Sequence, residues 1–145
     1  MHFKALFCQA LPDVKQIIIS LKTPLRIRCS GALIETVDFP TIIRNITNRM
    51  EAIVKRYGGW VDEMEIKQVQ ILASEVAVIQ NQLKMKNIKR YSNRLGEKKD
   101  FSGLVGDIQF EGNLTPFVPW LFAAQILHMG RNTTFGMGKI DVEFI

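Results

Sequence analysis

The residues with most potential for chemistry lie near the C-terminus, at positions 128–139, which read HMGRNTTFGMGK. The ten residues 130–139 include three glycines and two cations, namely Gly130, Gly136, Gly138, Arg131 and Lys139. Glycine lets the backbone approach a ligand closely and adopt positive φ. Backbone amides beside Arg and Lys suit a phosphate, because they combine directed donors with positive charge. The same residues also fit a tight helix-to-strand connection whose cations face water, and the segment alone leaves both interpretations open.

Two small-nucleotide sites are excluded by the spacing of this segment. A P-loop needs G-x-x-x-x-G-K-[ST] between a strand and a helix. Here Lys139 is followed by Ile140, and the segment leads into a strand pattern. A dinucleotide fingerprint needs a third glycine and an acidic residue much further on, but only seven residues follow Gly138.

A second informative region is the basic stretch 84–99. It contains seven cations against the single acid Glu97. In a strand, Arg90, Ser92 and Arg94 point to one face, about 7 Å apart, which matches successive phosphates or bases of a single-stranded RNA. The alternative is an edge strand that uses charge to discourage aggregation. We favour RNA contact, because a loop suited to polyanions lies in the same chain.

No complete active site is evident from the remaining polar residues. His128 follows an apolar helical run, where a histidine caps a helix more often than it catalyses, although near a phosphate it could act as a general acid or base. It is therefore a weak catalytic candidate, and the catalytic residue stays unknown. The cluster of Asp62, Glu63 and Glu65 fits a helix N-terminus, and no residues have metal-ligand spacing. We expect no metal and no cofactor.

Composition is that of one ordinary globular domain. The chain has 145 residues, 47% hydrophobic and 23% charged, and lacks repeats and linkers, so we expect a single domain over 1–145. A net charge of +5 favours a polyanionic partner. Cys8 and Cys29 are expected to be free thiols. No apolar run is long enough for a membrane span and no signal pattern begins the chain, so we expect a cytoplasmic location.

The first half of the chain predicts two strands and a helix. Residues 2–8 and 16–28 are rich in Phe, Ile and Leu and read as strands. Pro24 predicts an edge position or a bend in the second strand. Apolar residues at helical spacing after Asp38 predict a helix that stops at Gly58 and Gly59. The stretch 61–73 fits either a short helix or an irregular approach to a strand.

The second half of the chain predicts a long hairpin, a helix and a closing strand. Residues 75–95 read as extended, 96–102 as a polar turn, and 104–111 alternate as a strand. The run 117–127 is apolar nearly all round, which indicates a helix buried on most sides, against the sheet and against another domain. The resulting order is β-α-β-β-α-β. It predicts an α+β, ferredoxin-like fold with two helices on one face of an antiparallel sheet.

Several stretches, in the right order, resemble one family. Residues 19–27 are similar to its T-P-L-R strand, and residues 38–58 to its helix ending in Tyr-Gly. Residues 90–94 resemble its R-x-S-x-R strand, 103–106 the following G-x-x-G strand, and 130–138 its C-terminal glycine-rich motif. The family is the CRISPR repeat-processing endoribonucleases of the RAMP superfamily, the sixth Cas family. The resemblance is to their C-terminal half.

This resemblance implies a ferredoxin-like, RRM-related domain that binds CRISPR repeat RNA in antiviral defence. The implied RNA-binding residues are Arg90, Ser92, Arg94, Gly130, Arg131, Thr133, Thr134, Gly136, Gly138 and Lys139. In the family, cleavage is metal-independent: the RNA 2′-hydroxyl attacks the adjacent phosphate, and the general base is usually a histidine of an N-terminal domain. No stretch of these residues matches that domain, so enzymatic activity of this chain stays open.

The implied protein partners are an N-terminal RAMP domain, another Cas subunit or a second copy of the chain. The alternative function is a non-catalytic RAMP-like scaffold subunit of a CRISPR ribonucleoprotein. The apolar run 117–127 motivates that alternative, because one sheet cannot cover a helix that is apolar on all sides.

Overall fold

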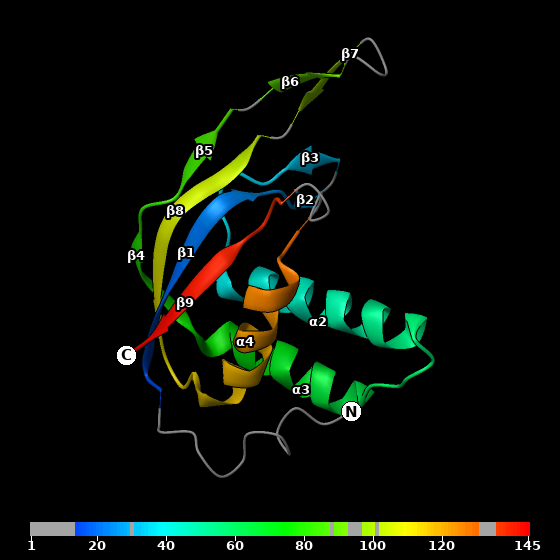
Figure 1. Ribbon diagram of the computed structural model, residues 1–145. Helices are drawn as coiled ribbons and strands as arrows, with labels where there is room; N and C mark the ends of the chain where they lie inside the picture. The colour runs from blue at the N-terminus through cyan, green and yellow to red at the C-terminus, as the bar shows by residue number, and fades with distance from the viewer. Residues whose placement is uncertain (1–13, 30, 88, 93–96, 101, 131–135) are drawn as a thin grey trace.

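The computed structural model describes residues 14–145 apart from 30, 88, 93–96, 101 and 131–135 (Figure 1). The predicted strand at 2–8 lies outside the described residues. The elements are β1 (Gln16–Leu25), β2 (Arg28–Cys29), β3 (Ala32–Leu33), α2 (Phe39–Arg56), α3 (Glu63–Leu72), β4 (Ala77–Asn81), β5 (Lys84–Lys86), β6 (Lys89–Ser92), β7 (Glu97–Asp100), β8 (Gly103–Glu111), α4 (Val118–Leu127) and β9 (Ile140–Phe144). Short 3-10 turns precede β4 and α4. No helix in the described part of the chain is long and apolar enough to cross a membrane.

The main sheet is antiparallel, with the strand order β4-β8-β1-β9, and β5 also pairs with β8. This order confirms the predicted ferredoxin-like arrangement. Of the two alternatives predicted for Pro24, a bend and an edge position, the edge position is wrong, because β1 lies between β8 and β9 (Figure 1). The pairing of β1 with β8 changes register between Leu21 and Leu25. That irregularity accommodates the proline, which has no N–H to donate to a neighbouring strand.

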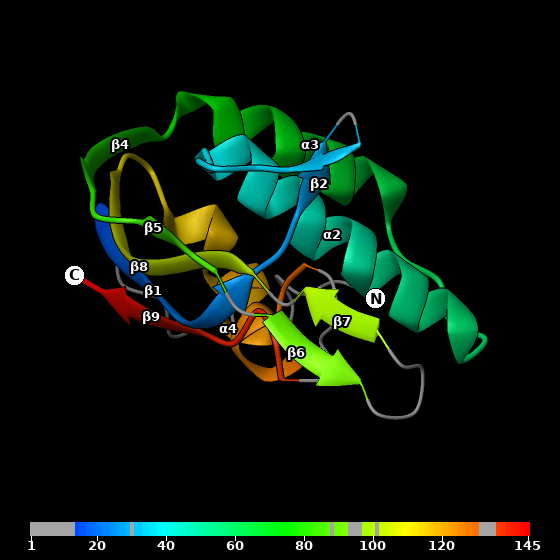
Figure 2. The same cartoon turned by 90° about the horizontal axis from the view of Figure 1, so that it is seen from above.

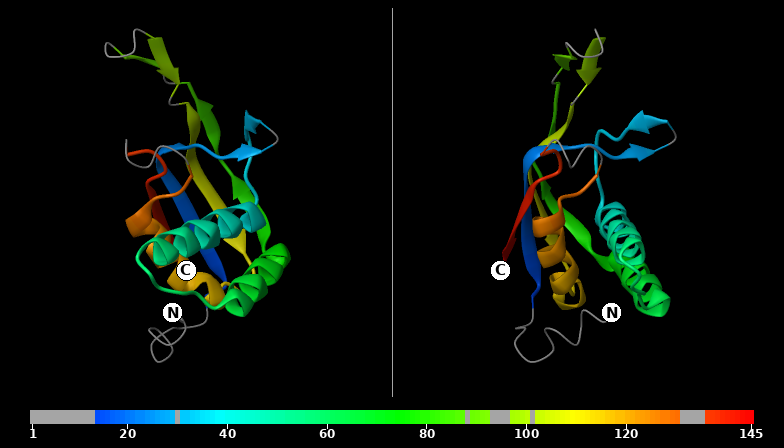
Figure 3. Two further views of the ribbon diagram at one scale, coloured as in Figure 1. Left: turned by 90° about the vertical axis from the view of Figure 1, so that its right-hand side faces the viewer. Right: turned by 45° about the vertical axis from the view of Figure 1, so that its right-hand side comes forward.

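Three helices cover one face of the sheet and leave the other face open (Figure 3). The α+β fold class is confirmed, and α3 adds a third helix in the stretch 61–73. Asp62 starts α3, because its carboxylate accepts from the amides of Met64 and Glu65, at 3.0 and 3.3 Å. The acidic cluster of the sequence is therefore the N-terminal turn of a helix.

Helix α2 forms where its sequence predicts it. The Asp38 carboxylate caps the N-terminus by accepting from the Thr41 amide at 2.9 Å, and Pro40 lies in the first turn, where a missing N–H costs nothing. Ile42, Ile43 and Ile46 form its buried stripe. The helix ends at Arg56, and Gly58 follows the C-cap residue Tyr57 with a φ of 77°, which is typical of a glycine after a helix C-terminus.

The core lies between the sheet and the helices. Alternate residues of β1, namely Ile17, Ile19 and Leu21, point into it. Phe39 links three elements, since its ring lies 5.0 Å from that of Phe110 on β8 and 4.9 Å from that of Phe117 before α4. Close aromatic packing of this kind fixes the start of α2 against the sheet.

Helix α4 is buried on one side and exposed on the other. Trp120, Leu121 and Ala124 are buried, whereas the exposed fraction is 42% for Phe122 and 79% for Ile126. The Phe122 ring stacks on Phe144 of β9, with centroids 5.2 Å apart. The predicted burial of this helix therefore holds for the side that faces the core.

Two hairpins project from the same end of the sheet (Figure 2). The hairpin β2–β3 follows β1, and the hairpin β6–β7 extends the β5–β8 ladder. The predicted polar turn over 96–102 is wrong at 97–100, because these residues form β7 and pair with β6. Strand pairing outweighs the low strand propensity of Lys and Asp there, as tertiary context often does.

Candidate nucleic-acid interface

The glycine-rich segment is tied to the C-terminal part of β1. The Gly138 amide donates to the Pro24 carbonyl, and the Met129 amide donates to the Gly138 carbonyl, each at 2.9 Å. The Thr23 hydroxyl donates to the Gly136 carbonyl at 2.6 Å and accepts from the Lys139 amide at 2.9 Å. These contacts hold the end of the segment at the end of the sheet from which both hairpins project.

The three glycines of this segment serve different purposes. A Cβ on Gly138 would lie 1.7 Å from the Met129 carbonyl oxygen, and one on Gly130 would lie 2.5 Å from the Arg26 carbonyl oxygen. Both positions therefore need glycine for close backbone packing. Gly136 has a φ of 82°, and no described residue comes within 4 Å of its missing Cβ. Its surroundings leave room for a ligand to approach the backbone.

Three described backbone amides of this segment are engaged inside the protein. Gly130 donates its N–H to the Asn45 side chain at 2.9 Å, and the amides of Gly138 and Lys139 donate to Pro24 and Thr23. These three amides are therefore held by protein acceptors, while the Lys139 side chain is exposed. Arg131, Thr133 and Thr134 lie outside the described residues, and their predicted role in RNA binding stays a prediction.

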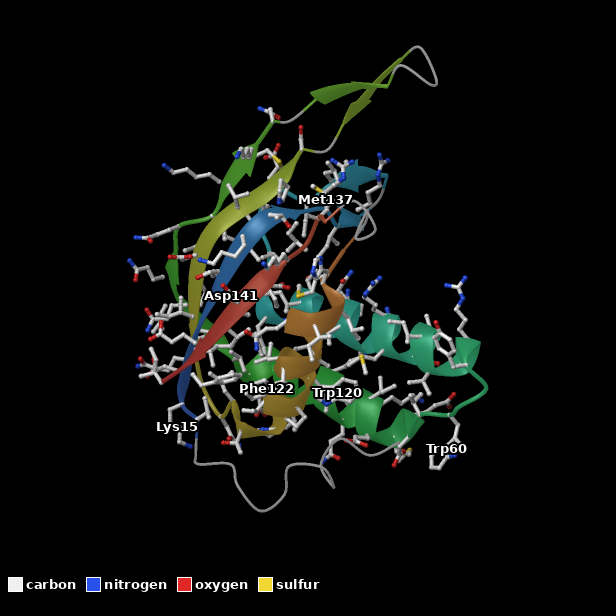
Figure 4. All side chains as sticks on the ribbon, viewed as in Figure 1. Lys15, Trp60, Trp120, Phe122, Met137 and Asp141 are labelled. Atoms are coloured by element: carbon white, nitrogen blue, oxygen red, sulfur yellow. The ribbon has the colours of Figure 1, made fainter. Side chains whose placement is uncertain are left out.

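His128 is the C-cap of α4 and has a φ of 63°, the one positive value for a non-glycine residue in the described part of the chain. Its amide donates to the Ala124 carbonyl, and its Nδ1 lies 3.2 Å from the Met137 carbonyl oxygen. The ring is therefore placed to hold the helix end against the glycine-rich segment, near Met137 (Figure 4). This geometry gives His128 a structural task.

The basic stretch of the sequence lies at the same end of the sheet. On β5, Lys84 and Lys86 are exposed, and Met85 between them pairs with Leu104. Leu104 in turn pairs with Leu25 of β1. Arg90 and Ser92 lie on β6, but their side chains are outside the described part of the structure, as is Arg94 altogether. The predicted row of Arg90, Ser92 and Arg94 stays a prediction.

Sequence reasoning missed three residues that position this end. Thr23 bonds the glycine-rich segment at two atoms, and Asn45 holds Gly130. Arg26 is 4% exposed and donates from Nη1 to the Ser102 carbonyl, which links the end of β1 to the start of β8. The T-P-L-R run contained a signal for Thr23 and Arg26. Nothing in the sequence marked Asn45.

The described side chains at this end include the exposed cations Lys84, Lys86 and Lys139 and the acid Asp38. Asp38 is held ionised by the Thr41 hydrogen bond, which lowers its pKa from the usual 3.8 against the opposing effect of burial. Its charge thus serves the α2 cap. No cluster of His, Cys, Asp or Glu among the described residues could hold a metal ion.

Comparison with known protein families decides the assignment. The model of the family described as CRISPR-associated endoribonuclease Cas6 matches residues 19–140. This chain belongs to the Cas6 family. The match includes the strand β1, the helix α2 and the glycine-rich segment that carried the resemblance in the sequence. A search of curated proteins gave no match.

Solved Cas6 structures share the fold. A Cas6 from Thermus thermophilus matches with a TM-score of 0.70 and 14% identity over 99% of this chain and 58% of its own. A Cas6 product complex matches with a TM-score of 0.63 and 16% identity over 99% of this chain and 56% of its own. A Cas6-RT-Cas1–Cas2 complex matches with a TM-score of 0.67 and 12% identity, and 16% of that chain is covered. The chain spans a little more than half the length of the first two.

Proposed function

We propose that this chain binds CRISPR repeat RNA and corresponds to the C-terminal, RNA-binding part of a Cas6 endoribonuclease. One observation carries the proposal: the glycine-rich segment is fixed to β1 at the end of the sheet where β5 and the β6–β7 hairpin bring the basic stretch. Two separate parts of the sequence thus supply cations to one end of one sheet. Cations placed close together bind a polyanion by releasing its counterions.

The proposed contacts are those expected from the sequence. Arg90, Ser92 and Arg94 on and after β6 contact phosphates or bases, and Lys139 contacts a phosphate beside Gly136. The open space at Gly136 supports an approach of the RNA backbone there. Arg131, Thr133 and Thr134 complete the proposed set.

Binding of labelled repeat RNA at low salt tests this proposal. We expect Arg90→Ala with Arg94→Ala to weaken binding about tenfold or more. The slope of log K against log salt should fall by about 0.7 for each phosphate of a single strand that the variant no longer neutralises. Lys67→Gln is the matched control, because it removes an exposed cation on α3, away from this end of the sheet. Absence of RNA binding by the unchanged chain would refute the proposal.

We propose that His128 orders the glycine-rich segment and does not act as the general base of cleavage. The Nδ1 contact with the Met137 carbonyl supports this role. Any cleavage of repeat RNA should therefore persist in His128→Asn, whose side-chain amide can donate to the same carbonyl. Loss of cleavage with unchanged RNA binding in that variant would contradict the proposal.

A scaffold function is the second candidate, and one observation favours it. Phe122, which is labelled in Figure 4, and Ile126 leave apolar surface exposed on α4, and the Phe122 ring stacks on that of Phe144. An apolar surface at the edge of a domain suits a partner such as an N-terminal RAMP domain, another Cas subunit or a second copy. Light scattering tests this: self-association that Ile126→Asp abolishes would favour the scaffold, and a monomer without dye-binding apolar surface would count against it.

We also propose that residues 1–145 form one domain that works in the cytoplasm. The single core shared by the sheet and the three helices supports one domain. Limited proteolysis that leaves a resistant body smaller than residues 14–145 would contradict the first part, and recovery from a membrane fraction would contradict the second.

A further inference from the structure

A groove runs along the exposed side of α2. It consists of two adjoining hollows of about 610 and 470 Å³ that share Asn45 and Asn48 as lining residues. We call this the α2 groove. The β2–β3 hairpin stands above α2 in both views of Figure 3. Arg28 of that hairpin lines the first hollow. The second hollow continues toward the C-terminal end of α2.

The lining of the α2 groove combines apolar side chains with arginines and asparagines. One stripe of α2 contributes to both hollows, at helical spacing: Thr41, Arg44, Asn45, Asn48, Ala52 and Arg56. Arg28, Arg44 and Arg56 are exposed. Among the described residues that line the two hollows, Asp38 is the one acid, and its carboxylate is engaged in capping α2. Because the cations outnumber the free acids, the groove favours an anion.

The chemistry of the lining fits RNA that is single-stranded. Asn side chains carry both a donor and an acceptor and can pair with the edges of unstacked bases, while Arg contacts phosphates or stacks on bases. Arg44 and Arg56 are separated by about 18 Å along the helix at 1.5 Å per residue, which is a span of several nucleotides. A duplex presents its bases inward, where the Asn side chains cannot pair with them, so a single strand is the better fit.

The α2 groove is continuous with the proposed RNA site. Gly130 lines its second hollow, and Asn45, which lines both hollows, holds the Gly130 amide at 2.9 Å. RNA bound at the glycine-rich segment therefore has a direct path onto α2. We infer that the α2 groove holds a single-stranded segment at one end of the repeat RNA, with Arg28, Arg44 and Arg56 contacting its phosphates. This inference rests on the proposed function.

A thermodynamic cycle between protein and RNA tests the inference. The probes are the full repeat RNA and versions trimmed stepwise from each end. The variant is Arg44→Gln with Arg56→Gln, which keeps two exposed helical positions as good helix formers. We expect the variant to bind the full repeat about tenfold more weakly, and to bind one trimmed RNA as well as the unchanged chain does. Its salt slope should fall by about 1.4, from two phosphates at about 0.7 each.

Two further variants separate charge from shape. Ala52→Trp fills the second hollow without changing charge, and we expect it to weaken binding of the full repeat and not of the same trimmed RNA. Lys67→Gln should leave both affinities unchanged. Thermal melting by circular dichroism confirms that each variant is folded.

The outcomes distinguish the inference from the proposed function. If the unchanged chain binds no RNA, both fail. If it binds RNA and neither α2 variant weakens the full repeat, the α2 groove plays no part and only this inference fails. If the α2 variants weakened binding of the full and the trimmed RNAs equally, the effect would be one of general charge, and the inference about the α2 groove would be wrong. The inference would also be wrong if the groove bound an acidic peptide more tightly than oligouridine.

Discussion

The open face of the sheet and the α2 groove form opposite environments on one small domain. The open face presents the acids Asp107, Asp141 and Glu143, with Lys22 lying 3.9 Å from Asp141. The groove presents arginines and asparagines. RRM-type sheets stack bases on aromatic residues of the open face, but every aromatic residue described on β1, β8 and β9 points toward the helices.

The difference indicates that the open face of the sheet is not the anion-suited surface of this domain, and that the sheet serves to position the surfaces at its end and on α2. Carboxylates on its open face repel phosphates, and that repulsion is screened beyond about 8 Å at physiological salt. A polyanion can therefore bind the end of the sheet and α2 without meeting it. The fold is RRM-related, but its anion-suited surfaces lie at one end of the sheet and on a helix, and not on the open sheet face that RRM domains use. Four predictions test this contrast.

The largest effect is expected at Gly138, which anchors the basic end. Gly138→Ala should lower the free energy of unfolding by about 3 kcal/mol, since a Cβ would overlap the Met129 carbonyl in a left-handed backbone. Gly136→Ala is the control and should cost about 1 kcal/mol, because its backbone is left-handed but its surroundings are open. Urea unfolding measures both. Equal costs would contradict the assigned roles.

The next effect concerns Thr23, which joins β1 to the glycine-rich segment. Thr23→Val keeps the shape but removes the hydroxyl that bonds Gly136 and Lys139. We expect a loss of about 1–2 kcal/mol, because a part-buried carbonyl and amide lose their partner. Hydrogen exchange at the Lys139 amide should accelerate more than exchange in β8. Thr23→Ser should restore much of the protection, and unchanged exchange in the valine variant would argue against the anchor.

A smaller effect is expected at the start of α2, where Asp38 lines the groove. Asp38→Ala should cost about 1 kcal/mol through loss of the N-cap, while Asp38→Asn should cost less. Folding lowers the Asp38 pKa below 3.8. The contribution of Asp38 to the free energy of unfolding is therefore complete above the ordinary aspartate pKa and is lost as the pH falls through the lowered value. The free energy of unfolding is measured against pH for the unchanged chain and for Asp38→Asn. The same pH dependence in both, below the ordinary aspartate pKa, would contradict this prediction.

The smallest effect is expected on the open face. Asp107→Asn with Asp141→Asn should change the affinity for repeat RNA by less than about twofold at physiological salt, and stability by about 0.5 kcal/mol or less, because exposed charges and ion pairs contribute little. Filter binding and thermal melting measure the two quantities. If this variant gained as much affinity for repeat RNA as the Arg44→Gln, Arg56→Gln variant loses, the RNA would lie on the open face of the sheet. The proposed difference between the open face and the α2 groove would then be wrong.

Much of the fold could be predicted from local patterns. The alternation of Ile17, Ile19 and Leu21, and the cap at Asp38, each specify an element through residues close in sequence. The errors arose from distant partners. Pro24 lies in a central strand because a register shift accommodates it, and residues 97–100 form a strand because β6 lies beside them.

The candidate site was predictable only in part. The composition of 130–139 pointed to an anion-suited loop, but it could not tell which glycines serve packing and which face open space. That distinction depends on the carbonyls of Met129 and Arg26, which the fold brings against Gly138 and Gly130. The α2 groove gave no local signal, because its stripe of polar residues reads as an ordinary solvated helix face.

The sequence by itself determined the element order, the ferredoxin-like class and the family resemblance, since helical and strand periodicity and short motifs are local properties of the chain. Only the tertiary structure decided where the cations gather. Thr23, Asn45 and Gly130 are far apart in sequence, and long-range hydrogen bonds bring them to one end of the sheet. Anion binding depends on charges close together in space, and that closeness follows from packing.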